Sequence, residues 1–123
     1  MKHKVVIQGK LEGLNEYIEA CRRNVYAGNK MKKDAENLAR YCIRSSLRGV
    51  KIKAPVWLHY TWYEPNKRRD KDNIASFGMK IIQDSLVKEK KLANDGWKDI
   101  EGFDHTFKVD KAHPRIEVII EEV

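Results

Sequence analysis

The chain has few cysteines and no long apolar run. Its two cysteines, Cys21 and Cys42, lie in helix-like patterns without C-x-x-C spacing or a clustered histidine, which argues against a zinc site. We expect both to be reduced, semi-buried thiols in a cytoplasmic protein. The first apolar run stops at Ile7, too short for a signal peptide, and no stretch approaches the roughly 20 residues of a membrane span. The sequence therefore predicts a soluble protein.

Acidic residues are the minority among the charged ones. The chain carries 25 Lys and Arg against 18 Asp and Glu, a formal net charge of +7. With 41% hydrophobic and 35% charged residues, the composition is globular rather than disordered. A length of 123 residues suits one domain with one core, so we expect a single domain over residues 1–123. The basic charge favours a polyanionic partner, either nucleic acid or an acidic membrane.

Hydrophobic periodicity predicts an α/β (α+β) domain with a small mixed sheet and about three helices. Strands are expected at residues 3–10, 50–63, 100–109 and 115–121, with Pro55 delaying the start of the second. Helices are expected at residues 14–26, 31–46 and 73–88. The segment Ala27-Gly28-Asn29 is expected to end the first helix. Trp57, Trp62 and Tyr63 of the second strand are expected in the core or at a dimer interface, with stacking on unpaired bases as the alternative.

Two aspartates separated by one residue precede the third helical pattern. Asp70 and Asp72 have the oxygen ligands that Mg²⁺ prefers, and both can converge at a strand-to-helix junction. Asp95, in a turn tightened by Gly96, can reach the same place from another segment. The alternatives are a helix N-cap for the pair and a simple turn for Asn-Asp-Gly. Three further aspartates are expected to be solvated surface charges: Asp84, Asp99 and Asp104.

Basic residues surround the acidic pair. A phosphate-cleaving site needs cations to hold the DNA backbone against carboxylates that repel it, and a solvated, charge-balanced loop is the alternative. The candidates for these contacts are Lys67, Arg68, Arg69 and Lys71. Lys80 lies two helical turns after Asp72, a rise of roughly 12 Å, near the same face. It is either a phosphate contact or an ordinary surface lysine.

These motifs occur in an order that resembles the RusA-type Holliday junction resolvases. The resemblance covers residues 67–121 and rests on Asp70-x-Asp72-Asn73, a helix running through Asp84-Ser85-Leu86, Asn94-Asp95 and a final strand from Pro114. It implies a homodimeric endonuclease, dependent on Mg²⁺ or Mn²⁺, that cuts four-way DNA junctions in recombination and repair. It implies no small-molecule cofactor and no membrane partner. Family members occur largely in bacteria, phages and prophages, so a bacterial cytoplasm is the expected location.

The resemblance also assigns roles to residues. It matches Asp70, Asp72 and Asp95 to the family's catalytic, metal-binding carboxylates. Alignment on the Asp84-Ser85-Leu86 segment matches Lys80 to the catalytic lysine, although the family's better-known pattern places that lysine at the position of Ser76. A junction-binding protein also needs phosphate contacts away from the scissile bond. The candidates, at the junction of the first two helices, are Arg22, Arg23, Lys30, Lys32 and Lys33.

Two other classes of function remain open. In the first, the chain is a non-catalytic module that binds branched DNA with the same fold. In the second, it is a small basic interaction protein that uses its aromatic strand as a partner surface. The basic residues at the helix junction then form only a solvated helix end.

Overall fold

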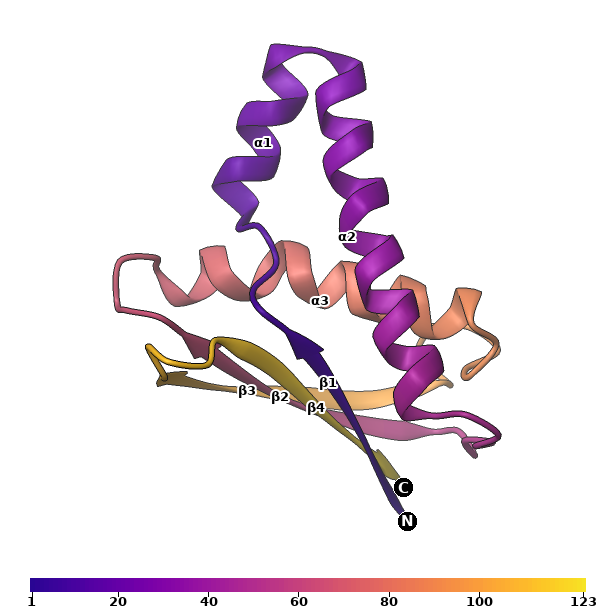
Figure 1. Ribbon diagram of the computed structural model, residues 1–123. Helices are drawn as coiled ribbons and strands as arrows, with labels where there is room; N and C mark the ends of the chain where they lie inside the picture. Colours follow the sequence, from indigo (N-terminus) through magenta and orange to yellow (C-terminus); the bar gives the residue numbers. More distant parts are fainter.

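Four strands form one mixed sheet in the order β1-β4-β2-β3. The computed structural model describes residues 1–123, with β1 (Lys2–Gln8), α1 (Leu14–Arg23), α2 (Val25–Ser46), β2 (Val56–Glu64), α3 (Lys71–Lys88), β3 (Ile100–Val109) and β4 (Arg115–Glu122). β4 pairs antiparallel with β1 and β2, whereas β2 and β3 are parallel and joined through α3. All three helices lie on one side of the sheet (Figure 1). The predicted α+β domain with a small mixed sheet and three helices is confirmed.

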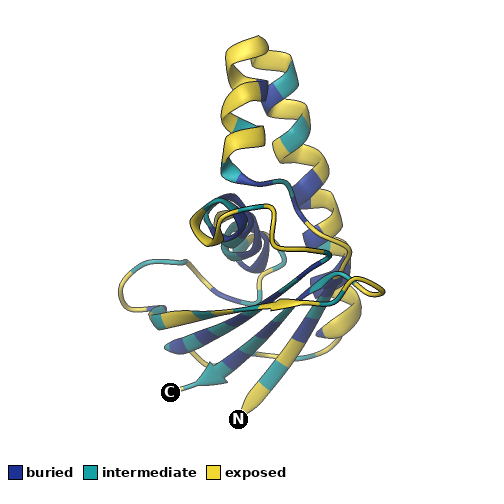
Figure 2. Ribbon diagram, turned by 90° about the vertical axis from the view of Figure 1, so that its left-hand side faces the viewer, coloured by how far each residue is buried: buried dark blue, intermediate teal, exposed yellow.

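The core lies between the sheet and the helices. β2 alternates strictly, so that Leu58, Tyr60 and Trp62 are buried beneath α3 while the residues between them face the open side of the sheet. Its neighbour β4 contributes Val118 and Ile120 to the same face. Figure 2 shows buried stretches on the strands of the sheet and on the helix above it. The predicted core position is confirmed for Trp62, whereas Trp57 and Tyr63 lie half-buried on the open face.

The boundary between the first two helices was predicted wrongly. α1 ends at Arg23, Asn24 is extended, and α2 begins at Val25, so Gly28 lies inside α2 rather than after α1. The Asn24 side chain caps α2, because its Oδ1 accepts a hydrogen bond from the Ala27 N–H at 2.7 Å. Gly28 is buried against α1, and a Cβ at this position would lie only 2.6 Å from Cys21 Sγ. It allows α2 to pack closely against α1, and the result is a helical hairpin.

The other boundaries are closer to prediction. β1, α3, β3 and β4 match the predicted ranges within two residues at each end. The strand predicted from residue 50 begins only at Val56, after a cis Ala54–Pro55 peptide bond.

Both cysteines are free, but Cys21 is exposed and only Cys42 is buried. No helix combines the length and apolar character needed to cross a membrane.

The hairpin of α1 and α2 is the most distinctive feature of the shape. The joined ends of the two helices project away from the sheet, while the rest of α2 packs against the domain (Figures 1 and 2). The projecting end is almost wholly exposed, as residues 21–26 all face solvent. This leaves α3, with the acidic pair at its start, between the sheet and the base of the hairpin.

Candidate metal and nucleic-acid site

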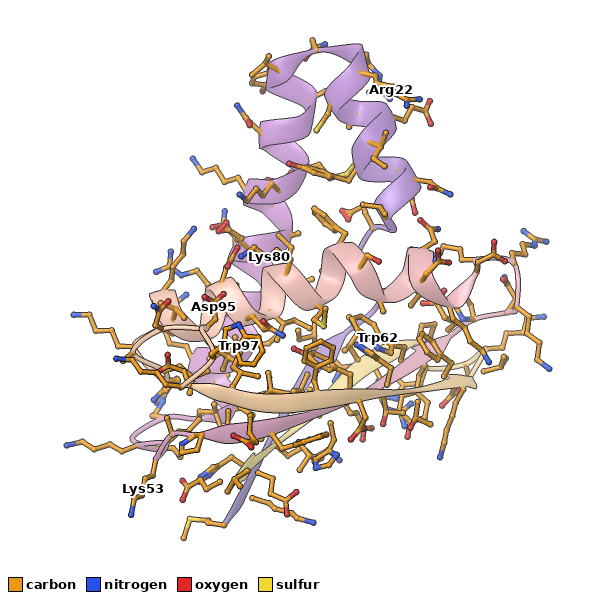
Figure 3. The ribbon with its side chains drawn as sticks, turned by 180° about the vertical axis from the view of Figure 1, so that it is seen from behind. Arg22, Lys53, Trp62, Lys80, Asp95 and Trp97 are labelled. Carbon is orange, nitrogen blue, oxygen red and sulfur yellow. The ribbon has the colours of Figure 1, made fainter.

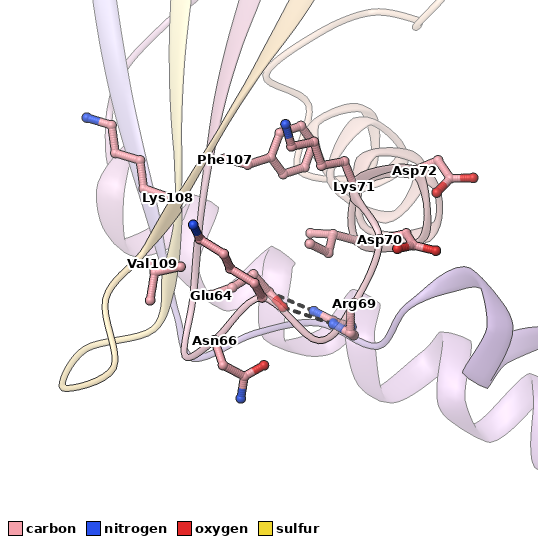
Figure 4. Close-up of a pocket in the computed structure, with 11 residues that line it drawn as sticks. Glu64, Asn66, Arg69, Asp70, Lys71, Asp72, Phe107, Lys108 and Val109 are labelled. Atoms are coloured by element: carbon pink, nitrogen blue, oxygen red, sulfur yellow. Dashed lines mark hydrogen bonds and ion pairs between the residues drawn. The ribbon is translucent and has the colours of Figure 1, made fainter.

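The acidic pair lies at the start of α3. Asp70 is the N-cap residue and Asp72 the second helical residue, and both are exposed. The Asp70 side chain makes no capping hydrogen bond; only its backbone oxygen accepts, from the Ile74 N–H at 3.0 Å. Both carboxylates point to the same side of the helix start (Figure 4). The N-cap alternative therefore describes the position of Asp70 but not what its side chain does.

A pocket of about 880 Å³ opens beside the pair, between the end of β2, the end of β3 and the start of α3. Its wall contains three lysines, Lys67, Lys71 and Lys108, together with the apolar Phe107. The Lys71 ammonium lies 5.8 Å from the centre of the Phe107 ring. Several cations beside two carboxylates provide separate places for a phosphate and for a cation bound to it.

Arg69 is held by protein groups instead of facing the pocket freely. Its guanidinium donates to Glu64 from Nε at 2.9 Å and from Nη2 at 2.8 Å, and to the Leu11 carbonyl at 3.1 Å. A weaker contact of 3.3 Å reaches Glu16. Burial lowers the pKa of Arg69, but the hydrogen bonds and charge of Glu64 outweigh it and leave that pKa raised. Of the predicted cations in this loop, the structure leaves Lys67, Arg68 and Lys71 exposed.

Glu64 lines the pocket and was not among the predicted site residues. It is the last residue of β2, directly before Pro65, and is only 6% exposed. The available signal was the alternation of β2, because Glu64 continues the inward phase of Tyr60 and Trp62. A carboxylate on that face needs a buried cationic partner, and Arg69 supplies it.

Asn73, the last residue of the Asp-x-Asp-Asn motif, ties α1 to α3. Its Oδ1 accepts a hydrogen bond from the Asn15 N–H at 2.7 Å, in the first turn of α1. Gly13 lies so close that a Cβ there would be 2.6 Å from Asn73 Nδ2. The residues of the motif therefore have two structural roles: the aspartates face solvent, and the asparagine holds the first turn of α1 against α3.

Asp95 and Lys80 form a second group further along α3. The Lys80 ammonium lies 3.0 Å from Asp84 Oδ1 and 3.7 Å from Asp95 Oδ2. The hydrogen bond and charge of Asp84 raise the pKa of Lys80, with a smaller contribution from Asp95. Figure 3 shows Lys80 and Asp95 side by side. Ser76, at the alternative lysine position, donates a hydrogen bond of 2.6 Å to the Asp72 carbonyl.

One chain does not bring the three predicted aspartates together. No group of three or more Asp, Glu, His or Cys side chains is placed to hold a metal ion. Lys80, and Asp95 beside it, lie about 12 Å along α3 from Asp72, at about 1.5 Å per residue. Asp70 and Asp72 nonetheless have hard oxygen donors that suit Mg²⁺, which keeps several water ligands and needs few protein ones.

Asp99 contradicts the prediction of a solvated surface charge. It is only 5% exposed, and its Oδ2 has no hydrogen-bond partner within the protein. It belongs to the same loop as Asp95, and its backbone N–H donates to the Gly96 carbonyl at 3.1 Å. A buried carboxylate oxygen without a partner is the kind of group that a cation or water satisfies. This loop is therefore a second place that can contribute oxygen ligands.

The predicted distal cations all lie at the end of the hairpin. Arg22 and Arg23 form the last turn of α1, and Lys30, Lys32 and Lys33 follow in α2; all five are exposed. Lys30 pairs with Asp34 at 2.9 Å.

Comparison with known families finds no family model that matches the chain, and comparison with curated proteins finds no significant match.

Proposed function

We propose that the chain is an Mg²⁺-dependent, structure-selective DNA endonuclease that resolves Holliday junctions by paired phosphodiester hydrolysis in recombination and repair. The observation that carries the proposal is the acidic pair itself. Asp70 and Asp72 point to one side of a helix start, and neither takes part in the ion pairs around them. Arg69 binds Glu64 and Glu16, while Lys80 binds Asp84 and Asp95. Two carboxylates left without protein partners next to a cationic pocket suit a metal ion and a phosphodiester.

The residues of the candidate site then have distinct tasks. Asp70 and Asp72 would hold Mg²⁺, which supplies Lewis-acid chemistry and lowers the pKa of a bound water. Lys67, Arg68 and Lys71 neutralise the DNA backbone next to the scissile bond. Lys80 donates to the negative charge that develops on the phosphate during hydrolysis. Arg69 holds the loop that carries the acidic pair through its two hydrogen bonds to Glu64.

The third aspartate is proposed to come from a second copy of the chain. Asp70 and Asp72 lie at the start of α3, and Asp95 lies beside its second half. A two-fold axis that runs two α3 helices antiparallel brings the start of each close to the second half of the other. β3 is the outermost strand on this side of the sheet, and Phe103 and Trp97 beside it are 45% and 99% exposed. This edge is a suitable dimer surface, and a dimer also supplies the two cuts that a symmetric junction needs.

Cleavage of a synthetic four-way junction tests the activity. In Mg²⁺ the protein should introduce paired, symmetric cuts, whereas Asp70→Asn, Asp72→Asn and Asp95→Asn should each bind the junction without cutting it. A linear duplex of the same sequence is the control. A protein that cuts the duplex freely and leaves the junction intact is not a resolvase.

Mixing variants tests the shared site. Asp72→Asn and Asp95→Asn are each inactive alone, but their heterodimer has one intact site. After random exchange of subunits, about a quarter of all sites are intact and nick one strand. Asp70→Asn mixed with Asp72→Asn is the matched control, because both changes damage the same half of every site and no activity returns. Recovery in neither mixture places all three aspartates in one chain.

One observation favours the alternative of a non-catalytic module that binds branched DNA. The residues of one chain form no cluster of three metal ligands. Junction binding that is indifferent to Mg²⁺ and to Asp70→Asn, without cleavage at any protein concentration, would support this alternative over the endonuclease.

A further inference from the structure

We propose that the end of the α1–α2 hairpin is a wedge that contacts the exposed base pair at a DNA branch point, through Val25 and Tyr26. The inference rests on the proposed function and adds to it the means by which the enzyme recognises a branch. It also assigns a task to the projecting end of the hairpin.

The wedge consists of two adjacent apolar side chains that contact little of the protein. Val25 and Tyr26 begin α2 and are 76% and 74% exposed. Scattered exposed apolar residues are ordinary, but these two are neighbours at the outermost turn of a projecting hairpin (Figures 1 and 2). Their position allows them to enter a space that the body of the domain cannot reach.

Basic residues predominate around the pair, although Lys30 is paired with Asp34 at 2.9 Å. Residues 22–33 contain five basic residues and no acidic one. Arg22, which Figure 3 places at the hairpin end, and Arg23 precede the wedge, and Lys30 follows it one turn later. An aromatic ring flanked by cations matches a nucleic-acid branch, where a base pair presents its flat face between phosphates.

The hairpin is connected firmly to the acidic pair. At its base, Asn15 donates to Asn73, the residue after Asp72, and Arg69, the residue before Asp70, donates to the Leu11 carbonyl at 3.1 Å. Along its length, Gly28 packs directly against Cys21. The ten residues of α1 therefore act as a rigid spacer of about 15 Å between the motif and the wedge. This length equals about four nucleotide steps at 3.4 Å each, so the wedge sets the cut close to the branch.

Substitution of the wedge in the full-length protein tests the inference. The probe is a four-way junction with 2-aminopurine at the branch, and binding is measured in EDTA so that cleavage plays no part. The unaltered protein should increase the 2-aminopurine fluorescence by unstacking the base. The V25S/Y26S variant should lose this increase and bind the junction about 10-fold more weakly, with unchanged affinity for linear duplex. Tyr41→Ser is the matched control, since Tyr41 is 65% exposed on α2 away from the hairpin end.

The outcomes separate the wedge from the proposed function. If V25S/Y26S opens and binds the junction like the unaltered protein, the wedge is refuted while the endonuclease stands. If the unaltered protein opens the junction but never cuts it in Mg²⁺, the endonuclease fails and the wedge stands. Binding to vesicles of phosphatidylserine and phosphatidylcholine that V25S/Y26S abolishes, with junction binding intact, would overturn the wedge and assign the hairpin end to acidic membranes.

Discussion

Removal of the Arg69 guanidinium should destabilise the protein far more than removal of an exposed arginine. In Arg69→Met, the Glu64 carboxylate, which is only 6% exposed, loses its cationic partner, and the Leu11 carbonyl loses its donor. Breaking a buried ion pair by removing one partner costs about 3–5 kcal/mol. Because the Arg69 side chain is itself 14% exposed, we expect the lower end, about 3 kcal/mol.

A double-mutant cycle isolates the pair. Glu64→Leu combined with Arg69→Met removes both charges, so the double variant should be less destabilised than Arg69→Met alone by about 2 kcal/mol. The measurement is urea unfolding followed by circular dichroism. With a slope of about 1.5 kcal/mol per molar urea, a loss of 3 kcal/mol lowers the midpoint by about 2 M.

The opposite result identifies a different role for Arg69. If Arg69→Met unfolds at nearly the midpoint of the unaltered protein and binds DNA more weakly, Arg69 is a phosphate contact like its neighbours. Arg68→Met is the control, because Arg68 is adjacent and exposed and should leave the midpoint unchanged. Equal midpoints for Arg69→Met and the double variant would refute the reasoning about an uncompensated buried charge.

Three further predictions follow from single contacts. Gly13→Ala should cost about 1–3 kcal/mol in urea unfolding because its Cβ would displace Asn73, and most of that cost should vanish in an Asn73→Ala background. A hydrogen bond to Glu121 raises the pKa of His59, with Asp104 adding to the effect against burial. This stabilisation is complete below the unfolded pKa of about 6.5 and is lost as pH rises through the raised folded value, so the gap in Tm between the unaltered protein and His59→Gln should shrink as pH rises above about 6.5. Lys80→Gln should slow single-turnover junction cleavage by roughly 10²–10³-fold with binding retained, and an unchanged rate would remove Lys80 from the site.

Helices and strands with a strong hydrophobic periodicity were predictable from the sequence. Boundaries that depend on packing against another element were not. β3 and the C-terminal end of α3 were located at their observed bounds because their patterns and flanking residues agree. Gly28 was read as a helix stop because its local propensity favours one. The structure uses it for close packing on Cys21, a contact that no local pattern encodes. The break between the helices lies at Asn24, whose side chain caps α2. The preference of Asn for the N-cap position was the local signal for this break.

The same distinction applies to the candidate site. The acidic pair was predictable because both aspartates belong to one segment. Whether Asp95 joins them is a question of three-dimensional distance, and the order of motifs along the chain carries no information on it. α3 is an 18-residue helix about 27 Å long, too rigid to bend its second half back toward its start. A third ligand from the same chain would need a loop that returns along the helix, yet the Asp95 loop stays beside Lys80. The length of this helix is the physical reason for proposing a site shared between two copies rather than a site within one chain.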